Sequence, residues 1–245
     1  MRRRTKAAHN APTAERVALS LPTVGGHTSG RAAKTEAARC YALDIEAPKK
    51  EDRAVTAPRI APLEPPYDAD TAALLAKWMP PGNDVEPLRL FRTLAVHDEL
   101  ASRMRPLGAG ILGHPRLRPR ERELLILRTC ARAGAEYEWG VHAIAFGAPL
   151  GLTERQLAAT VHGTADDPAW SEHDARLIAA VDALYDGDSI PDRLWAALAR
   201  RLGDDQLLEL VIVVGWYRLL SCVINVAQVE LEPWAPRFPE GPRAA

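Results

Sequence analysis

From Pro65 onward, apolar residues recur at helical spacing in segments that end at proline or glycine. Residues three or four apart share one face of a helix, so this spacing predicts amphipathic helices. The strict alternation of apolar and polar residues that is typical of strands is absent between the loop signals. We therefore expect an all-α domain of about eight helices over residues 62–236, carried by segments 70–79, 86–104, 120–132, 136–146, 153–163, 171–185, 191–201 and 204–230.

Helix-start signals support several of these boundaries. Pro119 suits the first turn of segment 120–132, where a missing N–H costs nothing. Thr153 and Gln156 match the capping-box pattern at the start of segment 153–163. The run from Leu124 to Leu127 is too apolar for a surface helix, so segment 120–132 is predicted to be buried.

The first 60 residues differ from the rest in composition. They are rich in Ala, Arg, Thr, Gly and Pro, and residues 1–40 carry eight Lys or Arg against two Glu. A segment with so little periodic apolar character is expected to be a disordered extension. Alternatively, the translation start was assigned too early and the segment is not part of the protein. An organellar transit peptide or a tail contacting nucleic acid are the alternatives. Residues 237–245 are predicted to form a short tail.

The cysteines indicate a reducing compartment. Cys40, Cys130 and Cys222 are odd in number, widely spaced and not arranged as CxxC. A disulfide framework is therefore not expected, and a cytoplasmic protein is the default.

The charge distribution limits the partners of the whole protein. The formal net charge is -1, which disfavours nucleic acid or an acidic membrane as a partner. The most apolar stretch, Leu207 to Ile224, is interrupted by Glu209 and Arg218, which are costly inside a bilayer. We interpret it as a core helix of a soluble protein rather than as a membrane span.

One pair of residues suggests acid/base chemistry. Glu138 and His142 are four residues apart, so their side chains share a helix face. Glu123 on the preceding helix directly precedes an apolar run, and we expect it to point into the domain or a subunit interface. A carboxylate beside an imidazole in a partly apolar setting can transfer protons near neutral pH. The alternative is an ordinary helix-stabilising Glu–His contact.

The remaining polar candidates are assigned structural roles. Cys130 is predicted to be a buried thiol, and His162 and His173 are predicted to be solvated because they lie in or near loops. A metal would need a third ligand beside Glu138 and His142, and no second cluster provides one. The glycines form no phosphate-binding pattern. Neither a metal nor an organic cofactor is expected.

The stretch from Arg120 to Gly151 resembles the carboxymuconolactone decarboxylase family. The resemblance rests on Arg-Glu-Arg-Glu-Leu, then Ala-Glu-Tyr-Glu-Trp-Gly-Val-His, then Gly-Ala-Pro-Leu-Gly-Leu-Thr. It continues more loosely through segments 174–184 and 207–226. It implies an alkylhydroperoxidase-D-like helical fold, a homotrimer or homohexamer, and a site between helices near subunit contacts.

The resemblance also implies a site without the redox-active cysteines of the peroxidase branch. The Cys-x-x-Cys-x-x-x-His motif of that branch places its cysteines at Ala135 and Glu138 and its final histidine at His142. The proton-relaying glutamate corresponds to Glu123, and a histidine found in some members corresponds to Tyr137. Proton-transfer groups are retained, whereas both sulfurs are absent.

The leading hypothesis is a cofactor-free acid/base enzyme, such as a decarboxylase, acting on a small oxo-acid or lactone. His142 would be the general acid/base, Glu138 and Glu123 would orient it or relay protons, and Tyr137 and Trp139 would contact the substrate. The two carboxylates would repel an anionic substrate, so a cation is needed, and Arg120, Arg122 and Arg128 are nearby in sequence. A thiol peroxidase and a non-catalytic ligand-binding oligomer are the alternatives.

Overall fold

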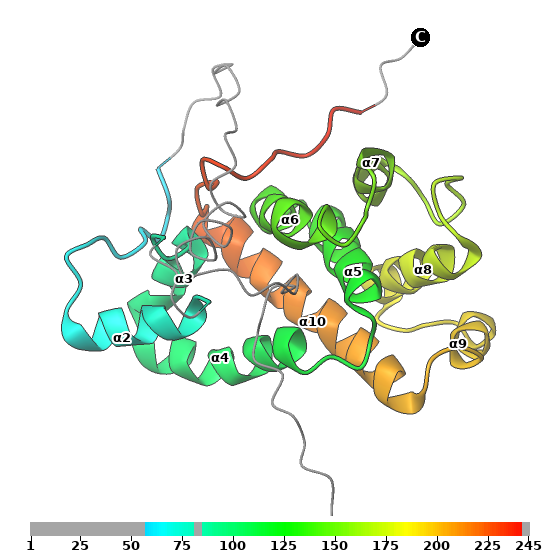
Figure 1. Cartoon of the computed structure of the whole chain (residues 1–245), viewed down its shortest axis with the longest axis horizontal. Helices are drawn as coiled ribbons and strands as arrows, with labels where there is room; N and C mark the ends of the chain where they lie inside the picture. Colours follow the sequence, from blue (N-terminus) through cyan, green and yellow to red (C-terminus); the bar gives the residue numbers. More distant parts are fainter. Residues whose placement is uncertain (1–56, 81–84, 242–245) are drawn as a thin grey trace, which may run out of the picture.

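The computed structural model describes residues 57–80 and 85–241 (Figure 1). Within these ranges every regular element is helical and no strand occurs, which confirms the all-α prediction. The elements are α2 (Ala69–Trp78), α3 (Arg89–Leu94), the 3₁₀ turn η1 (Ala95–His97), α4 (Asp98–Gly113), α5 (Pro119–Arg132), α6 (Glu136–His142), the π-helical segment η2 (Ala143–Gly147), α7 (Glu154–His162), α8 (Glu172–Gly187), α9 (Asp192–Ala199) and α10 (Asp204–Ala227).

Helix α5 lies at the centre of the domain and packs against α6, α7, α8 and α10. Every residue from Glu121 to Cys130 is buried, so this helix has no solvent face over its central turns. The predicted burial of segment 120–132 is confirmed, and Leu124 to Leu127 are completely inaccessible. In Figure 1, α2 and α3 lie toward one end of α10, α8 and α9 lie toward the other, and α4 runs along the lower side of the domain.

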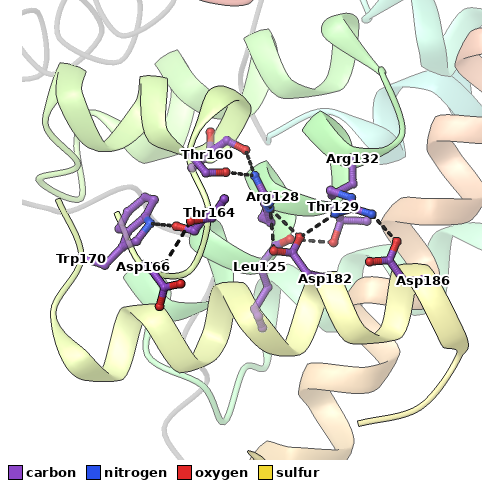
Figure 2. A network of polar contacts seen from close by, with 11 residues as sticks. Leu125, Arg128, Thr129, Arg132, Thr160, Thr164, Asp166, Trp170, Asp182 and Asp186 are labelled. Atoms are coloured by element: carbon purple, nitrogen blue, oxygen red, sulfur yellow. Dashed lines mark hydrogen bonds and ion pairs between the residues drawn. The ribbon is translucent and has the colours of Figure 1, made fainter. Parts of the chain in front are cut away.

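Arg128 anchors two neighbouring helices to α5. Its Nε and Nη2 donate to the two carboxylate oxygens of Asp182 on α8, at 2.8 and 2.9 Å. Its Nη1 donates to the main-chain carbonyls of Thr160 and Gly163 at the end of α7, both at 3.0 Å. Figure 2 shows this network, which Arg132 extends to Asp182. A buried guanidinium that is fully paired in this way fixes the orientation of both helices.

Helix α10 combines a buried face with an exposed apolar stripe. By length and hydropathy it is the one helix in the described ranges that could cross a membrane, and half of its most apolar stretch is buried inside the domain. The buried face packs on α4, α5, α6, α8 and α9, in agreement with its interpretation as a core helix. The exposed stripe consists of Leu208, Val211, Ile212, Leu219 and Val226.

The predicted helix over 86–104 is wrong as a single element. It is divided into α3 and α4 by η1, and α4 begins where Nδ1 of His97 accepts from Leu100 N. The helix then continues past Met104 to Gly113, through Pro106. Proline is tolerated there because the carbonyl that it leaves without a donor belongs to exposed Ser102, which water can reach.

Glu232 caps α3 from the far end of the chain. Its Oε1 accepts from Arg89 N at 2.7 Å, which satisfies a donor at the start of α3. The same oxygen accepts from the Tyr137 hydroxyl at 2.7 Å, and that hydroxyl accepts from Leu90 N at 3.1 Å. The segment after α10, residues 228–241, is called the C-terminal segment, and through Glu232 it joins α3 to α6.

Both ends of the described chain pack on the domain. Arg59 N and Ile60 N donate to Ala227 O, at 2.8 and 3.3 Å, where α10 ends three residues before its predicted end at 230. Phe238 N donates to Glu136 at 2.9 Å, so the predicted tail 237–245 begins in contact with α6. The prediction of disorder over 1–60 lies outside the described residues, apart from 57–60.

Gly140 allows the C-terminal segment to approach α6 closely. A Cβ atom at this position would lie 2.2 Å from the main-chain oxygen of Pro236 and 3.4 Å from Ala235. A backbone oxygen cannot rotate away as a flexible side chain can, so any larger residue must displace the segment.

We predict that Gly140→Ala destabilises the domain by about 1–3 kcal/mol, the usual cost of overpacking. Urea unfolding measures this change, and limited proteolysis should show faster cleavage after residue 232. Gly110→Ala on α4 is the matched control, because a Cβ atom added there would have nothing within 4 Å. The free energy of unfolding of that control should rise by up to about 1 kcal/mol, because alanine has a higher helix propensity than glycine. Equal stability of the two variants would contradict the close approach.

Candidate active site

A tight turn between α5 and α6 brings the predicted site residues together. Gly134 adopts a left-handed φ of 65° after α5 ends, which favours glycine at this position. Ala135 N then donates to Cys130 O at 2.9 Å, and α6 starts at Glu136. The chain reverses, so that Glu123 near the start of α5 faces His142 at the end of α6.

His142 lies between two carboxylates. Its Nδ1 is 2.7 Å from Glu123 Oε2, a hydrogen-bond distance, and its Nε2 is 3.6 Å from Glu138 Oε1. All three side chains are buried, and Glu123 is completely inaccessible, as its place before an apolar run predicted. The structure thus brings the three predicted catalytic residues into one cluster. The Glu123 contact fixes the ring, whereas Nε2 makes the longer and weaker contact.

Arg122 balances the charge of this cluster. Its Nε and Nη2 donate to Glu123 Oε1, at 3.2 and 3.1 Å, and the guanidinium is itself buried. Two carboxylates, one guanidinium and a protonated imidazole sum to zero charge. The predicted repulsion of an anionic substrate by Glu123 and Glu138 is therefore offset within the cluster.

The carboxylates determine the protonation state of His142. Burial lowers the pKa of the imidazole, but Glu123 and, to a smaller extent, Glu138 raise it by more, and the result is about 9. The sequence analysis expected proton transfer near neutral pH, and the two carboxylates keep the ring protonated there. At neutral pH His142 is an imidazolium and can donate a proton.

Three further side chains border the cluster, and the sequence analysis missed two of them, Tyr217 and Ser221. The Tyr217 ring on α10 meets the His142 ring edge-on, with centroids 5.0 Å apart. Ser221 lies one turn later and donates to Tyr217 O at 2.7 Å. Cys130 on α5 is fully buried beside Ser221, which confirms its predicted burial. The signal that could have found Tyr217 and Ser221 is a polar pair four apart in an otherwise apolar helix.

These neighbours are held in their neutral forms. Burial, together with the charges of Glu123 and Glu138, raises the pKa of the Tyr217 hydroxyl well above its usual value. Burial and the charge of Glu138 likewise raise the pKa of the Cys130 thiol. The cluster therefore contains a phenol and a thiol, not a phenolate or a thiolate.

The π-helical segment η2 lies directly after His142. Phe146 in this segment stacks on the His142 ring, with centroids 5.1 Å apart and planes inclined by 30°. Phe146 is partly exposed, whereas His142 is buried, so Phe146 covers the imidazole. Such π-helical turns are often found at functional sites, where the extra residue changes the direction of a side chain.

Tyr137 and Trp139 use their polar atoms away from His142. The Tyr137 hydroxyl donates to Glu232, and Trp139 Nε1 donates to Thr160 Oγ1 at 2.9 Å. The Trp139 ring also meets Phe238 in the C-terminal segment, with centroids 5.5 Å apart. These contacts position α6, and contact of the two side chains with a substrate stays a prediction.

The solvation prediction is right for His162 and wrong for His173. His162 is exposed and lies 2.7 Å from Pro239 O. His173 is only 8% exposed, because Glu121 on α5 pairs with its Nε2 at 2.8 Å. Proximity to a loop in the sequence did not prevent burial, since the first turn of α8 packs against α5.

The arginines near the site point in different directions. Arg122 alone of the three predicted candidates binds the His142 cluster, through Glu123. Arg120 pairs with Asp174 on α8 at 2.8 Å, and Arg128 pairs with Asp182. Among residues 57–80 and 85–241, no group of three or more His, Cys, Asp or Glu side chains is arranged to hold a metal ion.

Comparison with solved structures identifies the fold. One similar crystal structure is that of a peroxidase-related protein from Silicibacter sp. TM1040. The two sequences are 13% identical, and the structures superpose with a TM-score of 0.62 over 78% of this chain and all of the other chain. A cysteine-to-alanine variant of the debrominase Bmp8, bound to 2,3,4-tribromopyrrole, is 13% identical in sequence. Its structure has a TM-score of 0.60, and the match covers 74% of this chain and 94% of the Bmp8 chain. A third similar structure is that of the Agrobacterium tumefaciens protein ATU0492, described as a candidate AhpD antioxidant-defence protein. It is 17% identical in sequence with a TM-score of 0.52, and the match covers 57% of this chain and 95% of ATU0492.

Comparison of sequences finds one family model that matches part of the chain. No match is found among curated proteins. The profile of the carboxymuconolactone decarboxylase family matches residues 98–183, a range that runs from the start of α4 into α8 and includes Glu123, Glu138 and His142. Residues 98–183 therefore match a carboxymuconolactone decarboxylase family domain, and the chain has an AhpD-like fold.

Proposed function

We propose that this chain is a cofactor-free acid/base enzyme that decarboxylates a small oxo-acid or lactone, or catalyses a related proton transfer. The observation that carries the proposal is the buried imidazolium of His142, fixed at Nδ1 by Glu123 and free of a short hydrogen bond at Nε2. A general acid needs a proton that it can donate at the working pH and a fixed orientation toward the substrate. His142 has both.

The proposed step transfers one proton to carbon. The bond between the substrate carbon and its carboxylate breaks, CO₂ leaves, and the electron pair moves into the adjacent carbonyl to form an enolate. The Nε2–H of His142 then donates its proton to that carbon, which leaves a neutral imidazole. Glu138, 3.6 Å from Nε2, is placed to return a proton taken from water. The Tyr217 phenol is a candidate donor to the enolate oxygen.

The substrate class follows from the size and charge of the cluster. His142 is buried under Phe146, so a substrate must displace that ring or enter beside it. This limits the substrate to a small molecule, and the neutral total charge of the cluster tolerates a carboxylate. The debrominase Bmp8, which has a similar fold, binds a small unsaturated ring, and a ring of that size is the kind of substrate that we propose here.

Thiol-dependent peroxide reduction is less compatible with the site. Such chemistry needs a thiolate with a low pKa and a second, resolving thiol. Ala135 and Glu138 occupy the corresponding positions, and burial raises the pKa of the Cys130 thiol. We therefore expect no thiol-dependent turnover of hydrogen peroxide or of an alkyl hydroperoxide.

A homotrimer or homohexamer is proposed from the family resemblance. The apolar stripe on α10 is the surface that we assign to contacts between copies, because Leu208, Ile212 and Leu219 are exposed there. Gly215 lies in the middle of this helix with nothing within 4 Å of its side-chain position, which would allow a partner helix to approach closely.

We predict that His142→Gln lowers the rate of CO₂ release by about 10²–10⁴-fold, the usual contribution of a positioned general acid. A panel of small unsaturated lactone acids, including carboxymuconolactone, and of 3-oxo acids, whose decarboxylation gives an enolate, provides the substrates. Incorporation of solvent deuterium at the vacated carbon reports the proton transfer directly. His162→Gln, an exposed histidine on α7, is the control and should keep full activity. Full turnover by His142→Gln on a decarboxylated substrate would contradict the assignment.

We predict that an NMR titration gives His142 a pKa of about 9 and that Glu123→Gln lowers this pKa more than Glu138→Gln does. The folded-state pKa lies above the ordinary histidine value of 6.5, so the stabilisation from the imidazolium is complete below about pH 6.5 and is lost as the pH rises through 9. Urea unfolding of the wild type should show the free energy of unfolding falling between these pH values. The His142→Gln variant should not show this fall. A titration near 6.5 in the folded protein would argue against the two-carboxylate environment.

We predict that the purified protein is an oligomer by light scattering and that Leu219→Asp on α10 shifts it toward monomer. The reason is that a charge buried in an apolar interface is costly. Trp195→Asp, which changes an exposed apolar residue on α9, should leave the oligomer intact. A wild-type monomer at micromolar concentration, measured without detergent, would rule out this role of the stripe.

A further inference from the structure

A second group of titratable side chains lies at the start of α5, on the opposite face from His142. Glu121 precedes Glu123 by two residues, and two residues rotate an α-helix by about 200°. Glu121 accordingly faces α8, where its Oε1 lies 2.8 Å from Nε2 of His173. This group shares no side chain with the acid/base cluster.

Two adjoining cavities, each of about 220 Å³, are lined by this group. Arg118, Glu121, His173 and Arg201 line both of them. A volume of this size is suited to a small ion or metabolite rather than to a macromolecule.

Three helices begin around these cavities. Arg118 is the N-cap residue of α5, Ser171 is the N-cap residue of α8, and Gln206 lies in the first turn of α10. Each of these residues lines one or both cavities. The start of a helix carries a partial positive charge, so three such starts favour an anion between them.

The carboxylates at these cavities already have partners, whereas two guanidiniums do not. Glu121 binds His173 and also accepts from Arg118 N at 3.1 Å. Asp174 accepts from Arg120 Nη1 at 2.8 Å. Across the described ranges, the guanidiniums of Arg118 and Arg201 form no ion pair. The cavities therefore have an excess of positive charge.

His173 supplies a buried atom that lacks a partner. The residue is 8% exposed and its ring lines both cavities. Its Nδ1 is buried and has no hydrogen-bond partner among the residues that the structure describes. Buried polar atoms are nearly always paired, so this atom has a capacity for a hydrogen bond that no described residue uses. It can accept from a ligand hydroxyl or, as an imidazolium, donate to a ligand oxygen.

We propose that these cavities bind a small oxyanion, a phosphate or a carboxylate, held by the guanidiniums of Arg118 and Arg201 and by Nδ1 of His173. Planar guanidiniums suit both kinds of oxyanion because they donate two parallel hydrogen bonds. The site is distinct from the acid/base cluster, and it does not depend on the proposed reaction.

Titration of the ¹⁵N-labelled full chain with sodium phosphate and, separately, sodium glycolate tests the proposal. We expect saturable shifts of amide resonances in the first turns of α5, α8 and α10, with sodium chloride at matched ionic strength causing none. Tighter binding of phosphate or of glycolate tells which oxyanion the site prefers. Absence of saturable shifts with both ions at millimolar concentrations would overturn the proposal.

Variants separate a built site from general attraction to a basic surface. Arg118→Gln and Arg201→Gln should each weaken binding about tenfold, the effect of one lost hydrogen bond to a charged group. Arg116→Gln is the matched control, because its exposed side chain lies near the same helix starts, pairs with Asp205 at 3.7 Å and lines neither cavity. It should change the affinity less than about twofold. Equal weakening by all three variants would show nonspecific attraction and overturn the proposal.

Discussion

The pairing of buried charges on α5 is the constraint on which the arrangement of its neighbours depends. A charge taken out of water is stable only when it is paired and hydrogen-bonded. Glu121 pairs with α8, Glu123 with α6, and Arg128 with both α7 and α8. Each of these helices is therefore fixed by a directional polar contact as well as by packing. The acid/base cluster is one of these pairings, so the same contact serves the fold and the proposed chemistry.

The sequence predicted the local features of the fold well and its long-range features poorly. The apolar density of 124–127 correctly placed α5 in the core, and the capping-box pattern at Thr153 correctly marked the start of α7. The start of α3 at Arg89, rather than at the predicted residue 86, was missed, because the donor there is satisfied by Glu232, more than a hundred residues away. No local pattern contains that information.

At the candidate site, too, the sequence predicted local contacts better than contacts between distant segments. Spacing on one helix was enough to pair Glu138 with His142, whereas Glu123 was assigned chiefly through the family resemblance. Tyr217 was missed because its approach to His142 depends on how α10 crosses α6. The protonation state of His142 was also beyond the sequence, since it depends on two distances and on burial.

The contacts of Glu232 have a consequence for synthesis of the chain. This side chain caps α3 and accepts from Tyr137, which precedes it by 95 residues. Domains form progressively as a chain leaves the ribosome, but α3 and α6 cannot be joined in this way until Glu232 has emerged. The nascent chain therefore reaches this packing only after residue 232 has left the ribosome.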